Sequence, residues 1–170
     1  VDLMSSISND SIGDFVINSC KKIGINTLLL EKVSNLKNTL AIVDTMGDKT
    51  NAVLYREKPA DLFIDETFLK KVNLDSYLMI IVTGTSLSRN PSRNNVLKLM
   101  ELAIKRKIEI VLDIDYREGS WNDKKKAEKT LYSASLLSNI VVGNDLEFNF
   151  MSSDKNRGLS LASKLSKKNR

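Results

Sequence analysis

The chain has 170 residues, a hydrophobic content of 42% and a net charge of +5, a composition typical of a globular domain with a buried core. It contains no histidine and a single cysteine, which excludes an internal disulfide, histidine-dependent nucleophile pairs and histidine-ligated metal sites. Six of the cations and one acid lie in residues 154–170, so the rest of the chain is neutral and lacks the basic face that a nucleic-acid partner requires.

The first predicted elements are a strand, a helix and a strand. Residues 3–7 form the first strand, the helix begins at Asp10 or Ser11 and ends at Gly24, and residues 27–30 form the next strand. Apolar residues recur along the helix at helical spacing, at Ile12, Phe15, Val16, Cys20 and Ile23. We expect Cys20 to be a small buried side chain and the protein to occupy a reducing, cytoplasmic setting.

The alternation is interrupted by a predicted β-hairpin. Residues 39–44 and 51–56 are strand-like runs on either side of a glycine-containing turn at residues 46–49. We expect residues 38–64 to form a small lid that protrudes from the domain. An arginine on such a lid, Arg56 after Tyr55, can clamp an anionic substrate; the alternative is a solvated arginine at a strand edge.

The second half returns to alternating strands and helices. One helix opens at Asn90-Pro91, with Asn90 as the cap and the proline in the first turn, another begins at Asp123, and the basic tail forms the last helix. Three apolar runs between these helices are predicted strands: residues 77–82, 108–112 and 140–142. Right-handed crossovers then give an α/β fold, a parallel sheet flanked by helices in three layers, as one domain over residues 1–170.

Polar residues follow the strand at 108–112, where ligands of open α/β sheets bind. Arg117 can make a bidentate contact to a carboxylate or phosphate, and Trp121 can wall a pocket. Asp113 and Asp115 point to the same side if the strand persists that far, and one of them can hold Arg117 in place. The alternative is that Asp115 caps a turn and Arg117 pairs with a surface acid.

A second polar group, Gly143-Asn144-Asp145-Leu146-Glu147, follows the strand at 140–142. The amide of Asn144 can donate to a phosphate oxygen, and Glu147 can orient the water shell of Mg²⁺. The alternative, compatible with the first, is that Asn144 or Asp145 caps a short helix and Glu147 lies near its N-terminus.

The loop after the strand at 77–82 contains small residues, Gly84 and Thr85, that would let a ligand approach the backbone; an ordinary strand–loop–helix connection is the alternative. P-loop and dinucleotide-binding fingerprints are missing from the sequence. The longest apolar run, residues 78–82, is too short to cross a bilayer, and the first residues have no signal-peptide layout, so we expect no membrane partner.

These segments together resemble the ribokinase-like (PfkB) carbohydrate kinases across nearly the whole chain. Three local patterns carry the resemblance: Asp113-x-Asp115-x-Arg117 with Trp121, Asn144-x-x-Glu147, and the lid-like Leu54-Tyr55-Arg56 with Ala60-Asp61-Leu62. Gly84-Thr85 with Pro91-Ser92-Arg93 is similar to one branch, which phosphorylates 5-dehydro-2-deoxygluconate in inositol catabolism. Kinases of 2-dehydro-3-deoxygluconate or fructose are the alternatives within the family.

The resemblance implies transfer of the γ-phosphoryl group of ATP to a hydroxyl of a sugar acid, with Mg²⁺ as cofactor. Asn144 would contact the ATP phosphates, and Glu147 would act on the metal through water. The lid would close over the sugar, and family members often form homodimers through it. Substrate-binding roles fall on Tyr55, Arg56, Gly84, Thr85, Asp115, Arg117 and Trp121.

The sequence also departs from the family pattern. Ser8-Asn9-Asp10 stands where the family usually has Gly-Asp-Asp, and the glycine-rich start and the Gly-Ala-Gly-Asp helix with the catalytic aspartate are missing. We therefore expect that aspartate to follow Arg170 and residues 1–170 alone to be inactive as a kinase. Two functions of other classes remain: a non-catalytic α/β ligand-binding module, and an interaction domain that pairs through the exposed hairpin edge.

Overall fold

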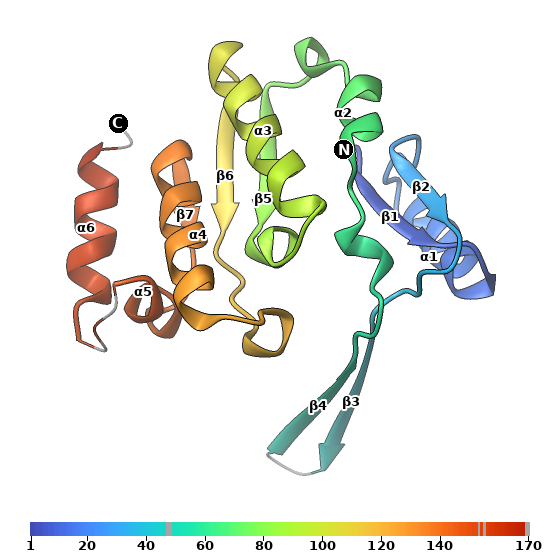
Figure 1. Ribbon diagram of the computed structural model, residues 1–170, viewed down its shortest axis with the longest axis horizontal. Coiled ribbons are helices and arrows are strands. Elements are labelled where there is room, and N and C mark those ends of the chain that lie inside the picture. The colour runs from blue at the N-terminus through green and yellow to red at the C-terminus, as the bar shows by residue number, and fades with distance from the viewer. Residues whose placement is uncertain (47–48, 153, 155, 169–170) are drawn as a thin grey trace. The chain divides into compact units, whose positions relative to one another are not determined.

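The structure, a computed structural model, describes residues 1–46, 49–152, 154 and 156–168. Its contacts divide the chain into two compact units, Val1–Ile64 and Asp65–Arg170 (Figure 1). The predicted lid, residues 38–64, lies in the first unit, and the interpretation of residues 1–170 as one partial domain stays a prediction. Among the described residues, none of the helices combines the length and the apolar character that a membrane crossing needs.

The first unit begins with a parallel β–α–β arrangement. Strand β1 (Ser5–Ser8) pairs with β2 (Leu30–Val33), and α1 (Ser11–Lys22) connects them. Of the two predicted caps, Asp10 is the one used, because its side chain accepts the backbone N–H groups of Ile12 and Gly13. The predicted end at Gly24 is confirmed by its positive φ of 77°, a conformation that favours glycine.

Two details of this unit differ from the sequence predictions. The strand predicted at 27–30 begins only at Leu30, because the Leu30 N–H donates to the carbonyl of Thr27 and closes a turn there. Cys20 is buried as predicted, but Phe15 and Ile23, on the same apolar side of α1, are 67% and 73% exposed. The apolar spacing therefore indicated the helix correctly but overstated how much of its face is buried.

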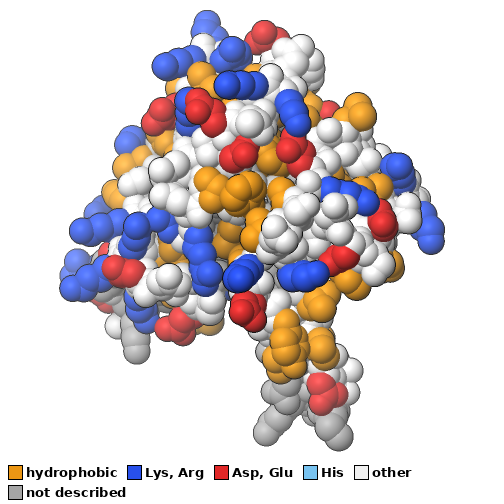
Figure 2. Space-filling model, turned by 45° about the vertical axis from the view of Figure 1, so that its right-hand side comes forward, with side chains coloured by type: hydrophobic (Ala, Val, Ile, Leu, Met, Phe, Trp, Pro, Cys, Tyr) orange, Lys and Arg blue, Asp and Glu red, His pale blue; other side chains and the backbone are white. Residues whose placement is uncertain are grey.

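The predicted hairpin is confirmed. Strands β3 (Leu40–Met46) and β4 (Lys49–Tyr55) are antiparallel, and the hairpin extends away from β1 and β2 (Figure 1). Residues 47 and 48 of the predicted turn lie outside the described residues. Hydrophobic side chains lie along the hairpin (Figure 2). Those at 40, 42, 53 and 55 share one face, because cross-strand partners point to the same side.

The second unit contains a parallel sheet of three strands in the order β5-β6-β7. They are β5 (Met79–Thr83), β6 (Glu109–Asp113) and β7 (Ile140–Val142). Helices α3 (Ser92–Lys105) and α4 (Lys124–Leu137) connect them and lie side by side over the sheet (Figure 1). Further helices are α2 (Glu66–Lys71), α5 (Asp145–Met151) and α6 (Gly158–Lys168), with 3-10 turns at Ala60–Leu62 of the first unit and at Leu74–Ser76, η3 (Gly84–Leu87) and Glu118–Ser120.

The core of this unit lies between the sheet and its two long helices. Its fully buried side chains include Met100 of α3, Ile110 and Leu112 of β6, and Leu131 of α4. The apolar run at β5 is only partly buried, because Val82 is buried and Ile81 is exposed. Alternate residues of a strand point to opposite faces, and the α3–α4 layer covers one of them.

The two predicted helix starts have different outcomes. Asp123 caps α4 as predicted, since its carboxylate accepts the Lys126 N–H. The prediction that Asn90 caps α3 is wrong, because Pro91 occupies the capping position and offers no side-chain oxygen. The Ser92 hydroxyl, at the first helical residue, instead donates to the carbonyl of Ser86 at 2.6 Å and ties the helix start to the preceding loop.

Asp10 makes the stability of the first unit depend on pH. Hydrogen bonds from the Ser8 hydroxyl and the Lys37 ammonium lower the pKa of Asp10 from 3.8 to about 2. The ionised carboxylate therefore favours the folded state above pH 3.8, and this contribution is lost as the pH falls towards about 2. We expect Asp10→Asn to lower the melting temperature at neutral pH. The melting temperature of this variant should also decrease less than that of the wild type when the pH is lowered to 2.

The matched control is Asp44→Asn, which removes an exposed carboxylate of the hairpin. Melting temperatures measured from neutral pH to pH 2 should follow the wild-type curve in this control. Identical curves for wild type and Asp10→Asn would contradict the assignment of the pH dependence to Asp10.

Candidate active site at the strand ends

The end of β6 places Asp115 in an unusual backbone conformation. The strand stops at Asp113, and Asp115 has a φ of 32°, so the condition for Asp113 and Asp115 to share one side is not met. Aspartate tolerates positive φ better than most residues. The turn directs the Asp115 carboxylate to both Thr85 and Arg117.

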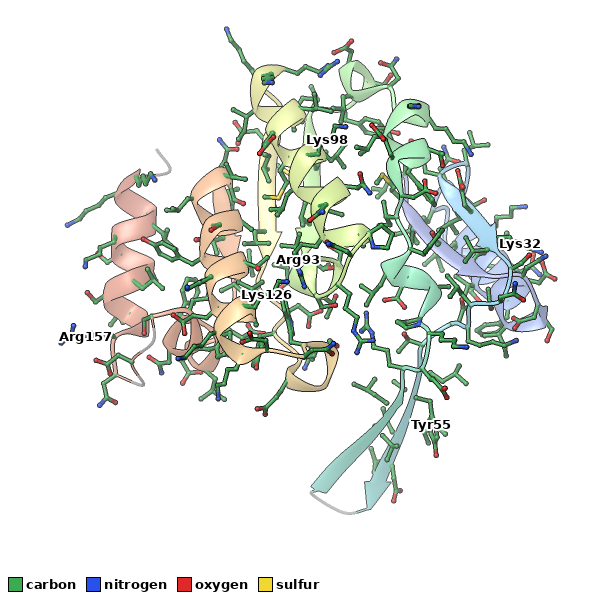
Figure 3. All side chains as sticks on the ribbon, in the orientation of Figure 1. Lys32, Tyr55, Arg93, Lys98, Lys126 and Arg157 are labelled. Carbon is green, nitrogen blue, oxygen red and sulfur yellow. The ribbon has the colours of Figure 1, made fainter. Side chains whose placement is uncertain are left out.

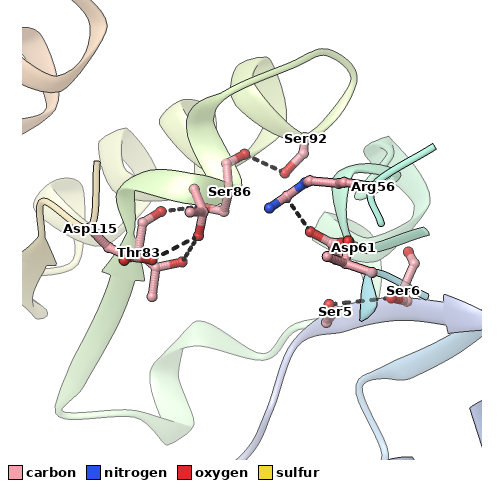
Figure 4. Close-up of polar contacts among 10 residues, drawn as sticks. Ser5, Ser6, Arg56, Asp61, Thr83, Ser86, Ser92 and Asp115 are labelled. Atoms are coloured by element: carbon pink, nitrogen blue, oxygen red, sulfur yellow. Dashed lines mark hydrogen bonds and ion pairs between the residues drawn. The ribbon is translucent and has the colours of Figure 1, made fainter. Parts of the chain in front are cut away.

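A chain of polar contacts joins the ends of β5 and β6 (Figure 4). The hydroxyl of Thr85 lies 3.2 Å from that of Thr83 and donates to Oδ2 of Asp115, also at 3.2 Å. On the other side, Nε and Nη2 of Arg117 each lie 2.8 Å from Oδ1 of Asp115. Three predicted substrate-binding residues, Thr85, Asp115 and Arg117, are therefore brought together from segments about 30 residues apart.

The ion pair leaves Arg117 accessible. Its side chain is 62% exposed, whereas that of Asp115 is 23% exposed. Asp115 holds the guanidinium on one side, as the sequence suggested, and the remaining N–H donors of Arg117 can still bind a carboxylate or phosphate. The contact is compatible with an Arg117 that binds an anion and with one that only pairs with a surface acid. The role of Arg117 in binding substrate therefore stays a prediction.

Glu147 connects the end of β6 with the end of β7. Its Oε2 accepts the Asn144 N–H at 2.9 Å, and the Asn144 side-chain oxygen accepts the Glu147 N–H at 3.0 Å, which is a capping box at the start of α5. Oε1 accepts the Tyr116 N–H at 3.0 Å. The predicted cap at Asn144 is confirmed, and the same carboxylate also anchors the loop that carries Asp115 and Arg117.

Asn144 and Glu147 also have atoms suited to the phosphate and metal roles that the family resemblance implies. The capping box uses the side-chain oxygen of Asn144 and does not require its amide nitrogen, a donor suited to a phosphate oxygen. Each oxygen of Glu147 accepts one backbone N–H and retains a lone pair for water bound to Mg²⁺. Among the described residues, no group of three or more Asp, Glu or Cys side chains is arranged around a metal position.

Tyr116 fixes the same loop by its side chain. Its ring stacks on Phe150 of α5, with centroids 3.8 Å apart and an interplanar angle of 16°. Burial, with a smaller contribution from Glu118, raises the pKa of the Tyr116 hydroxyl. This contact was not predicted, although the aromatic side chain of Tyr116 beside Arg117 could have indicated a packing role.

Two glycines lie close to Ile114, which is fully buried. A Cβ on Gly84 would lie 2.0 Å from the carbonyl oxygen of Ile114, and one on Gly143 would lie 2.5 Å from its Cδ1. The space beside Gly84 is thus filled by protein backbone. The small size of Gly84 serves close packing of the strand ends, and its predicted contact with a ligand stays untested.

The predicted lid residues lie in the first unit. Arg56 forms an ion pair with Asp61, which also accepts the Thr39 hydroxyl at 2.8 Å (Figure 4). The Arg56 side chain is only 11% exposed, so the alternative of a solvated edge arginine is wrong. Tyr55 is exposed at the end of β4 (Figure 3). Arg56 and Arg117 belong to different units, and their joint action on one acid stays a proposal.

Trp121 lies under Arg93, whose guanidinium carbon is 5.5 Å from the ring centroid. It is 8% exposed and lines a pocket of about 290 Å³ together with Arg89, Arg93 and Lys126. Trp121 therefore walls a pocket, but the lining of this pocket does not include Arg117, and the predicted place of Trp121 in a substrate pocket beside Arg117 stays a prediction. From the sequence, Arg93 was named only as part of the Pro91-Ser92-Arg93 pattern and Arg89 was given no role, although two arginines four residues apart around Pro91 indicate a local concentration of positive charge.

Comparisons with known proteins agree on one family. Residues 1–169 match the sequence pattern of the pfkB family carbohydrate kinases. The chain is 32% identical over 153 residues to a 5-dehydro-2-deoxygluconokinase of Clostridium tetani, covering 89% of this chain and 45% of that protein. A 5-dehydro-2-deoxygluconokinase of Mesomycoplasma hyopneumoniae is also 32% identical, over 147 residues, covering 84% and 43%. The chain thus spans less than half the length of these relatives.

Solved structures show the same fold. A PfkB protein from Polaromonas sp. JS666 superposes with a TM-score of 0.85 at 15% identity, covering 97% of this chain and 57% of that one. Fructokinase from Xylella fastidiosa with bound ATP superposes with a TM-score of 0.83 at 18% identity, covering 96% and 53%. The predicted ribokinase-like α/β fold, with parallel strands flanked by helices, is confirmed.

The close packing at Gly84 can be tested by adding one methyl group. We expect Gly84→Ala to lower the free energy of unfolding by about 1–3 kcal/mol, because the new Cβ collides with the backbone of Ile114. Gly119→Ala is the matched control, since a Cβ there meets nothing within 4 Å. Urea denaturation measures both variants, and equal stabilities for the two would contradict the packing role.

Proposed function

Because the chain belongs to the pfkB family of carbohydrate kinases, shown by the match over residues 1–169, we propose that the protein transfers the γ-phosphoryl group of ATP to a hydroxyl of a sugar acid. The cluster Thr85–Asp115–Arg117 carries this proposal. It presents an oriented arginine at the carboxyl ends of parallel strands, where open α/β sheets bind ligands. The Asn144–Glu147 capping box is attached to the same loop through Tyr116.

The two groups have different tasks in the proposed reaction. Arg117, oriented by Asp115, binds the acid end of the substrate, and Arg56 of the lid contributes a second cation. Asn144 donates to the phosphates of ATP, and Glu147 holds water of the Mg²⁺ shell. Phosphoryl transfer depends mainly on positioning and on neutralising charge, which these groups supply. The residues described here include no assigned acceptor for the hydroxyl proton.

We propose 5-dehydro-2-deoxygluconate, an intermediate of inositol catabolism, as the substrate of the whole protein in the cytoplasm. The support is the 32% identity to two proteins named for that activity, together with two arginines that suit a carboxylate. Tyr55, Gly84 and Trp121 complete the proposed substrate contacts by family resemblance. A kinase of 2-dehydro-3-deoxygluconate or of fructose is the alternative, and the fold is shared with fructokinase.

The substrate proposal predicts a specific loss in the intact protein. Arg117→Gln should raise the KM for 5-dehydro-2-deoxygluconate about 10- to 100-fold, because a charge-assisted hydrogen bond contributes about 1.5–3 kcal/mol. Arg106→Gln, at an exposed arginine paired with Asp75, should leave KM unchanged and controls for the loss of positive charge. Steady-state kinetics with both sugar acids and with fructose provide the measurement.

Turnover of fructose in preference to the sugar acids would contradict the substrate proposal but not the kinase. Failure of the intact protein to consume ATP with any of these sugars would contradict the kinase itself and favour a non-catalytic binding module.

We also propose that a second copy of the chain pairs with the hairpin, which would then serve as both lid and dimer contact. One face of the hairpin carries four exposed apolar side chains, Leu40, Ile42, Val53 and Tyr55. Isolated two-stranded hairpins are marginally stable in water, and the hairpin of a second copy packed against this face would cover its apolar side chains.

The dimer proposal predicts the effect of a charge on that face. Ile42→Lys should shift the protein towards the monomer in size-exclusion chromatography with light scattering, because burying an unpaired ammonium is unfavourable. Ile104→Lys, at an exposed apolar residue near the end of α3, is the control and should leave the mass unchanged. A hairpin variant with the wild-type mass would contradict this interface.

A further inference from the structure

A second polar pocket lies at the starts of α3 and α4, within the second unit. It is about 290 Å³ in volume, and the labelled Arg93 and Lys126 come from the first turns of the two helices (Figure 3). Apart from Trp121, none of the proposed substrate, ATP or metal residues lines it. The lining residues are Ser88, Arg89, Asn90, Arg93, Trp121, Asn122, Asp123 and Lys126.

Three residues of this lining carry a buried polar atom without a hydrogen-bond partner among the described residues. The atoms are Oγ of Ser88, Nε of Arg89 and Nε1 of Trp121. Ser88 and Trp121 are themselves more than nine-tenths buried. Leaving such groups unsatisfied is unfavourable, so a ligand that satisfies them would bind favourably. The indole and guanidinium nitrogens only donate, and the ligand must therefore accept.

The charges around the pocket favour an anion. Arg89, Arg93 and Lys126 contribute three cations against the single carboxylate of Asp123, whose Oδ1 already accepts the Lys126 N–H. Arg93 is fixed, because its guanidinium donates to the carbonyls of Leu87, at 2.7 Å, and of Ser88. Arg89 and Lys126 are the cations left to contact a ligand.

We propose that this pocket binds an oxyanion, the phosphate group of inorganic phosphate or of a small phosphate ester. Donors reach the pocket from two loops and from the first turn of α4, which suits a tetrahedral group with several acceptor oxygens better than a planar carboxylate. The site shares Trp121 with the proposed substrate contacts but none of its other lining residues, and phosphate binding to it does not depend on turnover. Trp121, the single tryptophan of the chain, reports on it directly.

The test is a titration of the protein with inorganic phosphate at constant ionic strength, followed by the fluorescence of Trp121. We expect a saturable change, and an apparent affinity about tenfold weaker in Arg89→Gln and in Lys126→Gln. Lys126 is exposed on α4, so this variant is expected to fold normally. Lys125→Gln, an exposed neighbour outside the lining, should bind phosphate like the wild type.

If glycerol 3-phosphate competes with inorganic phosphate for the pocket, the ligand class includes phosphate esters. If only inorganic phosphate binds, the ligand is the free ion. An equal response to acetate, or a response unaffected by Lys126→Gln, would overturn it. Loss of the response in Arg117→Gln would also overturn it, because phosphate would then occupy the proposed substrate site. Since no ATP or sugar is present, the result is independent of the kinase proposal.

Discussion

The carboxylate of Glu147 holds the candidate site together. It accepts the N–H of Asn144 at the start of α5 and the N–H of Tyr116 in the loop after β6, and so joins the segments that follow two neighbouring strands. Hydrogen bonds to an ionised acceptor are stronger than neutral ones. Asp115 and Arg117 flank Tyr116, and their positions therefore follow from this anchor. The same residue is the one proposed to reach the metal through water, so in that proposal Glu147 would serve both the structure and the reaction.

The close approach of the strand ends complements this anchor. Ile114 is buried between Gly84 and Gly143, at distances where a Cβ on either glycine would collide with it. At Gly84 the neighbour is the backbone of Ile114, so the loops after β5 and β6 can meet only because this position lacks a side chain, whereas a Cβ on Gly143 would require the end of the Ile114 side chain to shift. Packing around Ile114 thus brings Thr85 within hydrogen-bonding distance of Asp115. Small residues that resemble a ligand-binding loop in the sequence are here also a requirement of the fold.

Arginines of the second unit differ in what their surroundings leave available. Arg93 donates to backbone carbonyls and lies over Trp121, and burial lowers the pKa of its guanidinium. Arg117 is held by one carboxylate and remains mostly exposed. Residue type alone therefore does not separate an arginine that supports a loop from one that can bind an anion; burial and the number of internal acceptors do.

Features that depend only on neighbouring residues could be predicted from the amino-acid sequence. The hairpin, β7, the caps at Asp123 and Asn144, and the end of α1 at Gly24 were predicted, because capping, turn chemistry and apolar periodicity act within a few residues. Contacts between distant segments decided the rest. The late start of β2, the exposure of Phe15, the Asp61 partner of Arg56 and the place of Trp121 beside Arg93 all depend on which segments meet, and only tertiary packing specifies that.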